Sequence, residues 1–305
     1  MIIPEKLRKG DKAALLGGSG PVSEFSLEQM EQAVRDMGLE PVSYPSASAR
    51  HGYLAGDDQM RARDIMSAFC DPEIKGILTI RGGYGFARIL PLLDFEEIRK
   101  HPKFFMGYSD VTAMHTALNQ KADLATMHMI MVSAWLKDQD EYTMEQVRKA
   151  LFEDVNGELK DPQDYPERKT LVSGKGEGIL CGGNLTLLSQ SLGTPWEIDT
   201  KGRILFIEET DEPWWKIDGM INQLRNAGKL KEASGIVFGS WNHCGEDADP
   251  ERTLDIDEIL KELVIPEGTP CFKGIACGHS MPSMVLPLGR KAVLDADHCS
   301  LCILD

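Results

Sequence analysis

Short apolar runs alternate with longer amphipathic stretches through the first half of the chain. The runs have the length of buried strands, and the amphipathic stretches repeat apolar residues at helical spacing. The predicted strands are Lys12–Gly18, Pro41–Tyr44, Gly76–Ile80 and Phe104–Met106, and the predicted helices are Ser26–Met37, Asp58–Phe69 and Val111–Gln120. This alternation indicates a parallel sheet covered by helices, in which ligands bind beyond the carboxyl ends of the strands.

The second half begins after a polar stretch punctuated by Pro162, Pro166 and Gly174. Prolines and glycines interrupt regular structure, so this stretch is predicted to be an interdomain crossing. We therefore expect an N-terminal α/β domain at 1–140, a crossing at 141–170 and a C-terminal domain at 171–305. The elements predicted beyond the crossing are a helix from Asn184, a strand Arg203–Ile207, a helix Pro213–Asn226, a strand Gly235–Gly239, a helix Leu254–Leu263, and closing strands near Ser283–Leu286, Lys291–Leu294 and Cys299–Leu304.

Composition and charge exclude several classes of protein. The 305 residues are 42% hydrophobic and 27% charged, which is ordinary for a globular protein. The net charge of −15 and the lack of a basic run argue against a nucleic-acid partner, which needs a basic face. No apolar stretch approaches the ~20 residues that span a bilayer, so no membrane partner is expected. The first ten residues are polar, unlike a signal peptide, and a cytoplasmic protein is expected.

The cysteines give no sign of disulfides or of a metal site. Their number, seven, is odd, and they are scattered along the chain, so reduced thiols are expected. Cys271, Cys277 and His279 are close in sequence, but their spacing matches no zinc template. We therefore predict no metal ligands.

Ser109 follows the strand at Phe104, in the sequence Gly107-Tyr108-Ser109-Asp110-Val111. A serine between a strand and a helix has the position of a nucleophile elbow, where the helix start offers free N–H groups to an oxyanion. The usual second glycine of the elbow is Val111 here. The alternative is that Ser109 or Asp110 is the N-cap of the next helix, which the pattern alone favours.

Glycines also follow the strand Gly76–Ile80, in Arg81-Gly82-Gly83-Tyr84-Gly85. Such a loop lets the backbone approach a ligand and offers N–H groups to an anion. The backbone amide of Gly83 could then form an oxyanion hole with that of Asp110, and Arg81 could hold a substrate carboxylate. The alternative is an ordinary glycine turn that closes a βα unit.

Glu208 and His279 complete the candidate catalytic residues. A general base needs an imidazole and an anionic neighbour that fixes its tautomer, and the order Ser, Glu, His along the chain is that of α/β-hydrolase triads. Glu209 should point to the opposite face of its strand. Glu208 could equally be a solvated residue at the sheet rim, and His128 or His243 could replace His279 as the base.

Several motifs together resemble the LD-carboxypeptidase family of serine peptidases, which includes muramoyl-tetrapeptide carboxypeptidases and microcin C immunity proteins. The resemblance runs nearly end to end. It rests on RGGYGFARILPLLDFEEI, FMGYSDVTAMH, CGGNLTLL, ILFIEE, PWWKIDGMINQLR, GIACGH and VLPLG. The chain departs from the family at His128-Met129-Ile130-Met131, where His-Gly-Pro-Met is common, and at Gly17-Gly18-Ser19-Gly20, where many members have Ala-Pro-Ser.

The resemblance implies a triad of Ser109, Glu208 and His279 and an oxyanion hole from the amides of Gly83 and Asp110. It also implies an N-terminal parallel α/β domain with the nucleophile, a C-terminal mixed domain rich in β-structure with the other two residues, and an active site in a cleft between the domains. No metal or organic cofactor is required. The adjacent Trp214 and Trp215 could stack on substrate or form the first turn of a packed helix.

The expected function is that of a serine carboxypeptidase which releases terminal D-Ala from murein tetrapeptides, as in peptidoglycan recycling. An immunity-type member would instead cleave a peptidyl or aminoacyl nucleotide, so the partner is a small peptide or a peptidyl-nucleotide. A homodimer is one of the assemblies open to such a chain. A different class of function is a non-catalytic nucleotide-binding module, because Gly17–Gly20 follows the first strand, although its spacing is not G-x-G-x-x-G.

Overall fold

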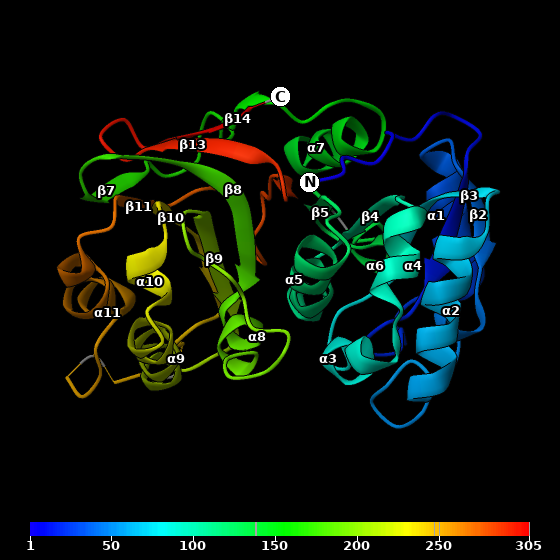
Figure 1. Ribbon diagram of the computed structural model, residues 1–305, viewed down its shortest axis with the longest axis horizontal. Coiled ribbons are helices and arrows are strands. Elements are labelled where there is room, and N and C mark those ends of the chain that lie inside the picture. Colours follow the sequence, from blue (N-terminus) through cyan, green and yellow to red (C-terminus); the bar gives the residue numbers. More distant parts are fainter. Residues whose placement is uncertain (138, 247, 250, 305) are drawn as a thin grey trace. The chain divides into compact units, whose positions relative to one another are not determined.

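The computed structural model describes residues 1–137, 139–246, 248–249 and 251–304 (Figure 1). They form two compact units: unit 1 is residues 1–155 with 285–289, and unit 2 is residues 156–284 with 290–305. This division differs from the predicted crossing at 141–170. Residues Glu141–Phe152 form helix α7 of unit 1, because Val147, Ala150 and Leu151 lie in its hydrophobic core.

Unit 1 contains a six-stranded sheet with the order β12-β5-β4-β3-β1-β2. Five of its strands are parallel, and β12 at the edge runs antiparallel to β5. The strands are β1 (Lys12–Leu16), β2 (Glu40–Ser43), β3 (Ile74–Thr79), β4 (Phe104–Gly107), β5 (Thr126–His128) and β12 (Leu286–Leu288). The predicted parallel α/β fold of the N-terminal part is therefore confirmed.

Helices cover both faces of this sheet (Figure 1). Helices α1, α6 and α7 share one buried cluster with strand residues such as Leu15 and Met106. On the other face α2 to α5 pack against one another, and Phe69 of α2 stacks on Phe105 of β4. The helices of unit 1 are α1 (Leu27–Asp36), α2 (Asp58–Cys70), α3 (Phe86–Ile89), α4 (Phe95–Lys100), α5 (Thr112–Lys121), α6 (Val132–Trp135) and α7.

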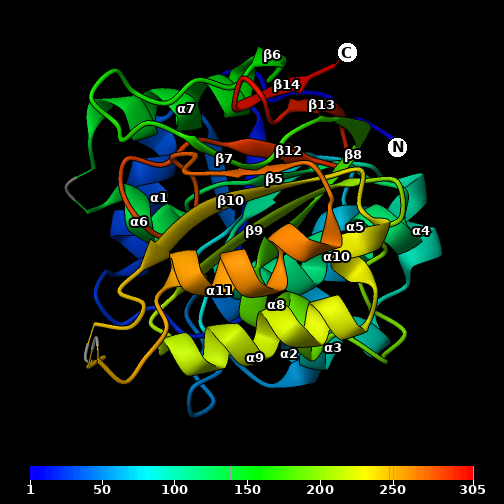
Figure 2. The same cartoon turned by 90° about the vertical axis from the view of Figure 1, so that its left-hand side faces the viewer.

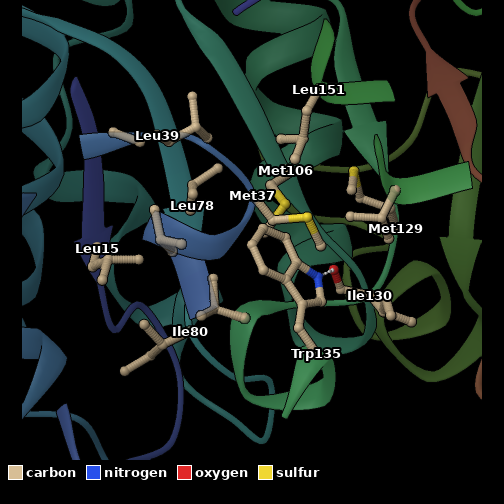
Figure 3. Close-up of a cluster of buried hydrophobic side chains, with 14 of the residues drawn as sticks. Leu15, Met37, Leu39, Leu78, Ile80, Met106, Met129, Ile130, Trp135 and Leu151 are labelled. Carbon is tan, nitrogen blue, oxygen red and sulfur yellow. Dashed lines mark hydrogen bonds between the residues drawn. The ribbon is translucent and has the colours of Figure 1, made fainter. Parts of the chain in front are cut away.

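The first of these faces has a core in which one polar group is buried and paired (Figure 3). The indole of Trp135 lies among methionine and leucine side chains, and its Nε1 donates a 3.1 Å hydrogen bond to the carbonyl of Ile130. A buried indole N–H without a partner would cost about 1–3 kcal/mol. This bond therefore lets an aromatic side chain fill the core next to the segment that follows β5.

Unit 2 contains an eight-stranded mixed sheet with the order β6-β14-β13-β8-β9-β10-β11-β7. The central strands β8 to β11 are parallel, and antiparallel strands flank them on both sides. The strands are β6 (Gly157–Glu158), β7 (Lys169–Val172), β8 (Lys175–Asn184), β9 (Ile204–Thr210), β10 (Gly235–Asn242), β11 (Cys271–Lys273), β13 (Lys291–Asp295) and β14 (Ser300–Ile303). The predicted mixed C-terminal fold, rich in β-structure, is confirmed.

Helices α8 to α11 pack against the parallel strands of unit 2 (Figure 2). They are α8 (Leu185–Gln190), α9 (Trp214–Asn226), α10 (Lys229–Glu232) and α11 (Ile256–Leu263). Leu205 and Ile207 of β9 lie in the cluster that these helices cover, so Glu209 belongs to that face and Glu208 to the opposite one. None of the helices in the described parts of the chain is both long and apolar enough to cross a membrane.

Candidate active site

Ser109 has a strained backbone at the turn between β4 and α5. Its φ of 63° lies in the left-handed region, which costs a non-glycine residue about 1–3 kcal/mol. Ser109 opens the short 3₁₀ turn Ser109–Val111, and no side chain caps the start of that turn or of α5. The helix-cap alternative for Ser109 is therefore wrong. A strained serine after a parallel strand has the local geometry of a nucleophile elbow.

Two glycines make room for this turn. A Cβ on Gly107 would lie 2.6 Å from Thr79 Oγ1 and 2.7 Å from a methyl group of Val111. A Cβ on Gly82 would lie 2.9 Å from the Cβ of Ser109. All three distances are below ordinary contact, so a side chain at either position would displace the turn.

The buried imidazole of His115 holds the end of β4. Its Nε2 lies 2.9 Å from the carbonyl oxygen of Gly107 and its Nδ1 lies 2.8 Å from Thr126 Oγ1. Because a carbonyl can only accept, Nε2 carries the proton and Nδ1 accepts from the hydroxyl. Burial lowers the pKa of His115 to about 4, so the ring is neutral at physiological pH.

The carboxylate of Asp110 connects the turn that carries Ser109 to two neighbouring loops. Its Oδ2 accepts hydrogen bonds from Ser19 Oγ at 2.6 Å and from the backbone N–H of Phe86 at 2.9 Å. Burial raises the pKa of Asp110, against the lowering effect of these hydrogen bonds. The side chain thus ties the segment after β1 and the glycine loop after β3 to the turn that carries Ser109.

Other contacts also hold the glycine loop after β3 in place. The backbone N–H of Gly20 donates a 3.0 Å hydrogen bond to the carbonyl of Gly82. Gly85, with φ of 143°, lies against the guanidinium of Arg61, which is fully buried and donates to the carbonyl of Gly18. The loop therefore has a fixed backbone, with Gly83 exposed and at a φ of 116°.

Glu208 and His279 form a hydrogen-bonded pair in unit 2. Glu208 Oε2 lies 2.6 Å from His279 Nδ1, and the carboxylate is fully buried while 14% of the histidine side chain is exposed. Burial lowers the pKa of His279, but the charge and hydrogen bond of Glu208, with the charges of Glu209 and Asp211, outweigh it, so the pKa is raised. Nδ1 bound to the carboxylate leaves Nε2 as the nitrogen that could take a proton.

The neighbours of this pair fix its position. Gly278 has φ of 128°, and a Cβ there would lie 2.5 Å from Ser240 Oγ and 2.9 Å from Glu208 Oε2. The hydroxyl of Ser240 also accepts a 3.2 Å hydrogen bond from the backbone N–H of Ser280. The loop that carries His279 can therefore approach Glu208 only with glycine at 278.

Glu209 has a structural role on the opposite face, as the alternation of the strand predicts. Its carboxylate accepts from Asn184 Nδ2 at 2.6 Å, from the backbone N–H and hydroxyl of Thr186 at 2.7 Å each, and from its neighbour Thr210. These bonds secure the start of α8 on the end of β9. Burial raises the pKa of Glu209 despite them.

The two alternative bases have other surroundings. His128 is 1% exposed and its ring lies edge-on to that of Tyr108, with centroids 6.2 Å apart. His243 is exposed, and it forms an ion pair with Glu246, three residues away on the surface. The carboxylate that pairs with His243 is exposed, whereas the carboxylate of Glu208 that pairs with His279 is buried.

Two of the remaining candidate residues are the tryptophans at the start of α9. Trp214 packs on the backbone of Gly245, and Trp215 is 69% exposed; both line a hollow of unit 2. Among the described residues, the only cluster with metal-ligand spacing is Cys70, Glu97 and His101, at the surface of unit 1, and it does not include Cys271, Cys277 or His279. The linking role of Asp110 and the role of His115 could not be predicted from local sequence, since both depend on tertiary contacts.

Known proteins with similar sequences are carboxypeptidases. Models of the LD-carboxypeptidase N-terminal and C-terminal domains match residues 14–129 and 177–294. A probable murein peptide carboxypeptidase of Bacillus subtilis is 38% identical, over 96% of this chain and 91% of its own length. A murein tetrapeptide carboxypeptidase of Pseudomonas aeruginosa is 26% identical, over 91% and 92%.

Solved structures have the same fold. The MccF-like protein of Bacillus anthracis superposes with a TM-score of 0.88 at 27% identity, covering 100% of this chain and 99% of its own. The muramoyltetrapeptide carboxypeptidase of Oxalobacter formigenes superposes with a TM-score of 0.83 at 29% identity, covering 96% and 99%. Both domain models match in order and cover most of the chain, and we conclude that the chain belongs to the LD-carboxypeptidase family of peptidases.

Proposed function

We propose that this protein is an L,D-carboxypeptidase that releases D-Ala from murein tetrapeptides in the cytoplasm, during peptidoglycan recycling. Ser109 is the nucleophile of the proposed triad, His279 the base and Glu208 the residue that orients the base. The observation that carries the proposal is the 2.6 Å bond between Glu208 and His279, together with the strained backbone of Ser109. The resemblance to the family implies that Ser109 completes the triad with this pair. The names of the relatives support the murein substrate.

The proposed reaction is acyl transfer to serine followed by hydrolysis. Ser109 Oγ attacks the amide carbonyl while His279 Nε2 takes its proton, and Glu208 stabilises the imidazolium. The backbone N–H groups of Gly83 and Asp110 hold the oxyanion. His279 then protonates the leaving amine of D-Ala, and water, deprotonated by the same imidazole, releases the peptide and restores Ser109.

The state of His279 sets the pH range of this chemistry. A base must be neutral to accept a proton, and the raised pKa of His279 moves its neutral form to higher pH than 6.5. We expect the acidic limb of kcat/KM to have its midpoint above 6.5.

Trp215 and Arg81 are proposed to contact the peptide on either side of the scissile bond.

The test is release of D-Ala from L-Ala-γ-D-Glu-meso-diaminopimelyl-D-Ala by the purified protein. The wild type should release D-Ala and should be labelled by a serine-reactive phosphonate, and Ser109→Ala should do neither. Ser133→Ala, at a nearby partly buried serine of α6, is the matched control and should retain both. Tight nucleotide binding without labelling would replace the hydrolase with a non-catalytic nucleotide-binding module.

A second candidate is hydrolysis of a peptidyl or aminoacyl nucleotide, with the same triad. The likeness to the MccF-like protein of Bacillus anthracis favours it. The two reactions release different leaving groups, D-Ala in the first and a nucleotide in the second, so substrate turnover separates them. Release of amino acid from an aminoacyl-sulfamoyl adenosine without release of D-Ala from the tetrapeptide would select this second function.

A further inference from the structure

A hollow of about 520 Å³ lies in unit 1 beside the candidate oxyanion loop. Three segments line it: the turn after β1 with Gly20 and Pro21, the loop with Arg50 and Tyr53, and the loop after β3 with Arg81, Gly83 and Tyr84. Its size falls in the range of about 300–1,000 Å³ that small-molecule sites occupy. The proposed chemistry at Ser109 uses Gly83 and Arg81 from this lining and gives no role to Arg50, Tyr53 or Tyr84.

The hollow lies at the position where this fold binds ligands. Strand β1 has β2 on one side and β3 on the other, so the sheet order reverses there. Doubly wound sheets bind ligands in the crevice at the carboxyl ends of the two strands that flank such a point. The hydrogen bond from Gly20 to Gly82 joins the two loops at that crevice.

The charge of the hollow is positive in a chain whose net charge is −15. Arg50 and Arg81 both line it, and no aspartate or glutamate is among the described residues that do. Arg81 donates from one terminal nitrogen to the carbonyl of Pro21 at 2.8 Å, which orients its guanidinium. Within the described parts of the chain, neither arginine has an acidic partner within ion-pair distance. Guanidinium groups of this kind bind carboxylates.

Aromatic rings form the wall of the hollow. Tyr53 and Tyr84 are 67% and 46% exposed, and their ring centroids lie 6.0 Å apart at an angle of 60°. Exposed rings beside two cations offer an apolar surface to a short aliphatic side chain and leave the charged end of a ligand to the arginines. This favours an amino acid over a bare inorganic anion.

The hollow is also close to the candidate nucleophile. Gly83 lines it, and Gly82 packs so closely on Ser109 that a Cβ would lie 2.9 Å from the serine Cβ. In a peptide, the carboxylate of the last residue is about 3.5 Å from the preceding carbonyl carbon. A carbonyl held at the Gly83 amide would therefore place a terminal carboxylate within reach of the hollow.

We propose that the arginine hollow binds the terminal carboxylate of the leaving D-amino acid, with Arg50 as a specificity residue beside Arg81. The inference rests on the proposed function, which it deepens. It explains how an enzyme that attacks at Ser109 would select the last bond of a peptide rather than an internal one. A nucleotide phosphate offers similar chemistry to the arginines, and the experiment separates the two sources.

The test measures binding to Ser109→Ala, which holds the substrate without turnover, by titration calorimetry. The tetrapeptide with a free carboxylate should bind about tenfold or more tightly than its C-terminal amide. Adding Arg50→Gln should remove most of the difference in affinity between acid and amide and leave the amide unchanged, and Arg50→Lys should restore part of that difference. Arg63→Gln, at an exposed arginine of α2 outside the hollow, is the matched control.

Three results would overturn the inference: no binding of the acid peptide, equal binding of acid and amide, or equal weakening of both by Arg50→Gln. Displacement of the peptide by adenosine monophosphate, with a stronger dependence on Arg50 than the peptide shows, would assign the hollow to a phosphate instead. Release of D-Ala by the wild type is measured separately. Release without discrimination of acid from amide rejects the hollow alone, and discrimination without release rejects the murein reaction alone.

Discussion

The turn of Ser109 and the pair of Glu208 with His279 are built in different ways. In unit 1 the backbone places the nucleophile: a left-handed φ, two glycines without room for a Cβ, and a carbonyl held by a neutral histidine. In unit 2 a buried carboxylate places the imidazole through one short hydrogen bond. The turn in unit 1 depends on a strained backbone, and the pair in unit 2 depends on a buried charge.

This difference indicates how each region should fail. A change in unit 1 should alter geometry or stability and leave proton affinities nearly unchanged. A change in the pair should alter proton transfer and leave the fold intact, because His279 lies on a loop and is partly exposed.

The largest expected effect is on catalysis in unit 2. His279→Ala should lower kcat by ~10³ or more, because the members of a triad act as a unit, and should leave the secondary structure intact. Steady-state release of D-Ala and circular dichroism measure the two quantities. His243→Ala and His128→Ala are the controls; an inactive His243→Ala or His128→Ala beside an active His279→Ala would show that the base is misassigned.

The next effect is on stability in unit 1 and depends on pH. The unfolded state binds a proton at His115 near pH 6.5, and the folded state does so only near pH 4, so stability should fall as pH decreases through this window. The full difference corresponds to about 3 kcal/mol. Urea unfolding at several pH values measures it.

His115→Asn should flatten that pH dependence, although it lowers stability at pH 7 by removing the bond to Gly107. The control is His51→Asn at an exposed histidine, which should keep the wild-type slope. A slope between pH 6.5 and 4 that is the same with and without His115 contradicts the assignment of a neutral buried ring.

A smaller effect should come from the carboxylate below the turn. Asp110→Ala removes the oxygen to which Ser19 Oγ and the Phe86 N–H both donate, so the glycine loop should shift and kcat should fall about 10- to 100-fold with little change in KM. The control is Asp64→Ala, at a buried carboxylate that accepts from the Ser46 N–H. That variant should lose stability and retain kcat. An equal loss of kcat in both variants would show that Asp110 contributes only to folding.

The smallest effect tests the strain itself. Because glycine adopts φ of 63° without strain, Ser109→Gly should be more stable than Ser109→Ala by about 1 kcal/mol. At Ser67, an exposed position of helix α2, the order should reverse, since glycine weakens a helix. Denaturant unfolding of the four variants gives the comparison, and the same order at both positions would mean that the turn is not strained.

Regular periodicity predicted most of the fold, and glycines account for the missed strand β8. Strand β8 begins at the end of the polar stretch that predicts an interdomain crossing, and its pattern does not indicate a strand because four of its ten residues are glycines. The structure gives the reason: a Cβ at Gly176, Gly178 or Gly182 would lie 2.1, 2.3 or 1.9 Å from a neighbouring backbone oxygen. The glycines permit close approach of chains there, and a sequence pattern cannot distinguish that use from a turn.

The site was predictable as residue types and not as contacts. Alternation along β9 placed Glu208 and Glu209 on opposite faces correctly, since it depends only on strand geometry. The choice among His279, His128 and His243 could not be made from position, because it depends on which loop returns to the buried carboxylate. Similarly, nothing local shows that Asp110 would bond to a serine 91 residues earlier.

Strand β12 has a consequence for the order in which the protein is made. The edge of the unit 1 sheet is completed by residues 286–288, which the ribosome adds after most of unit 2. Until then β5 is an open strand edge, which can pair with another chain. Removing 285–289, or cutting the chain after residue 155, should therefore leave a fragment that associates through β5. The two parts of the chain that separate family models match are thus not two independent folding units. The first part lacks its edge strand until residues 286–288 have been synthesised.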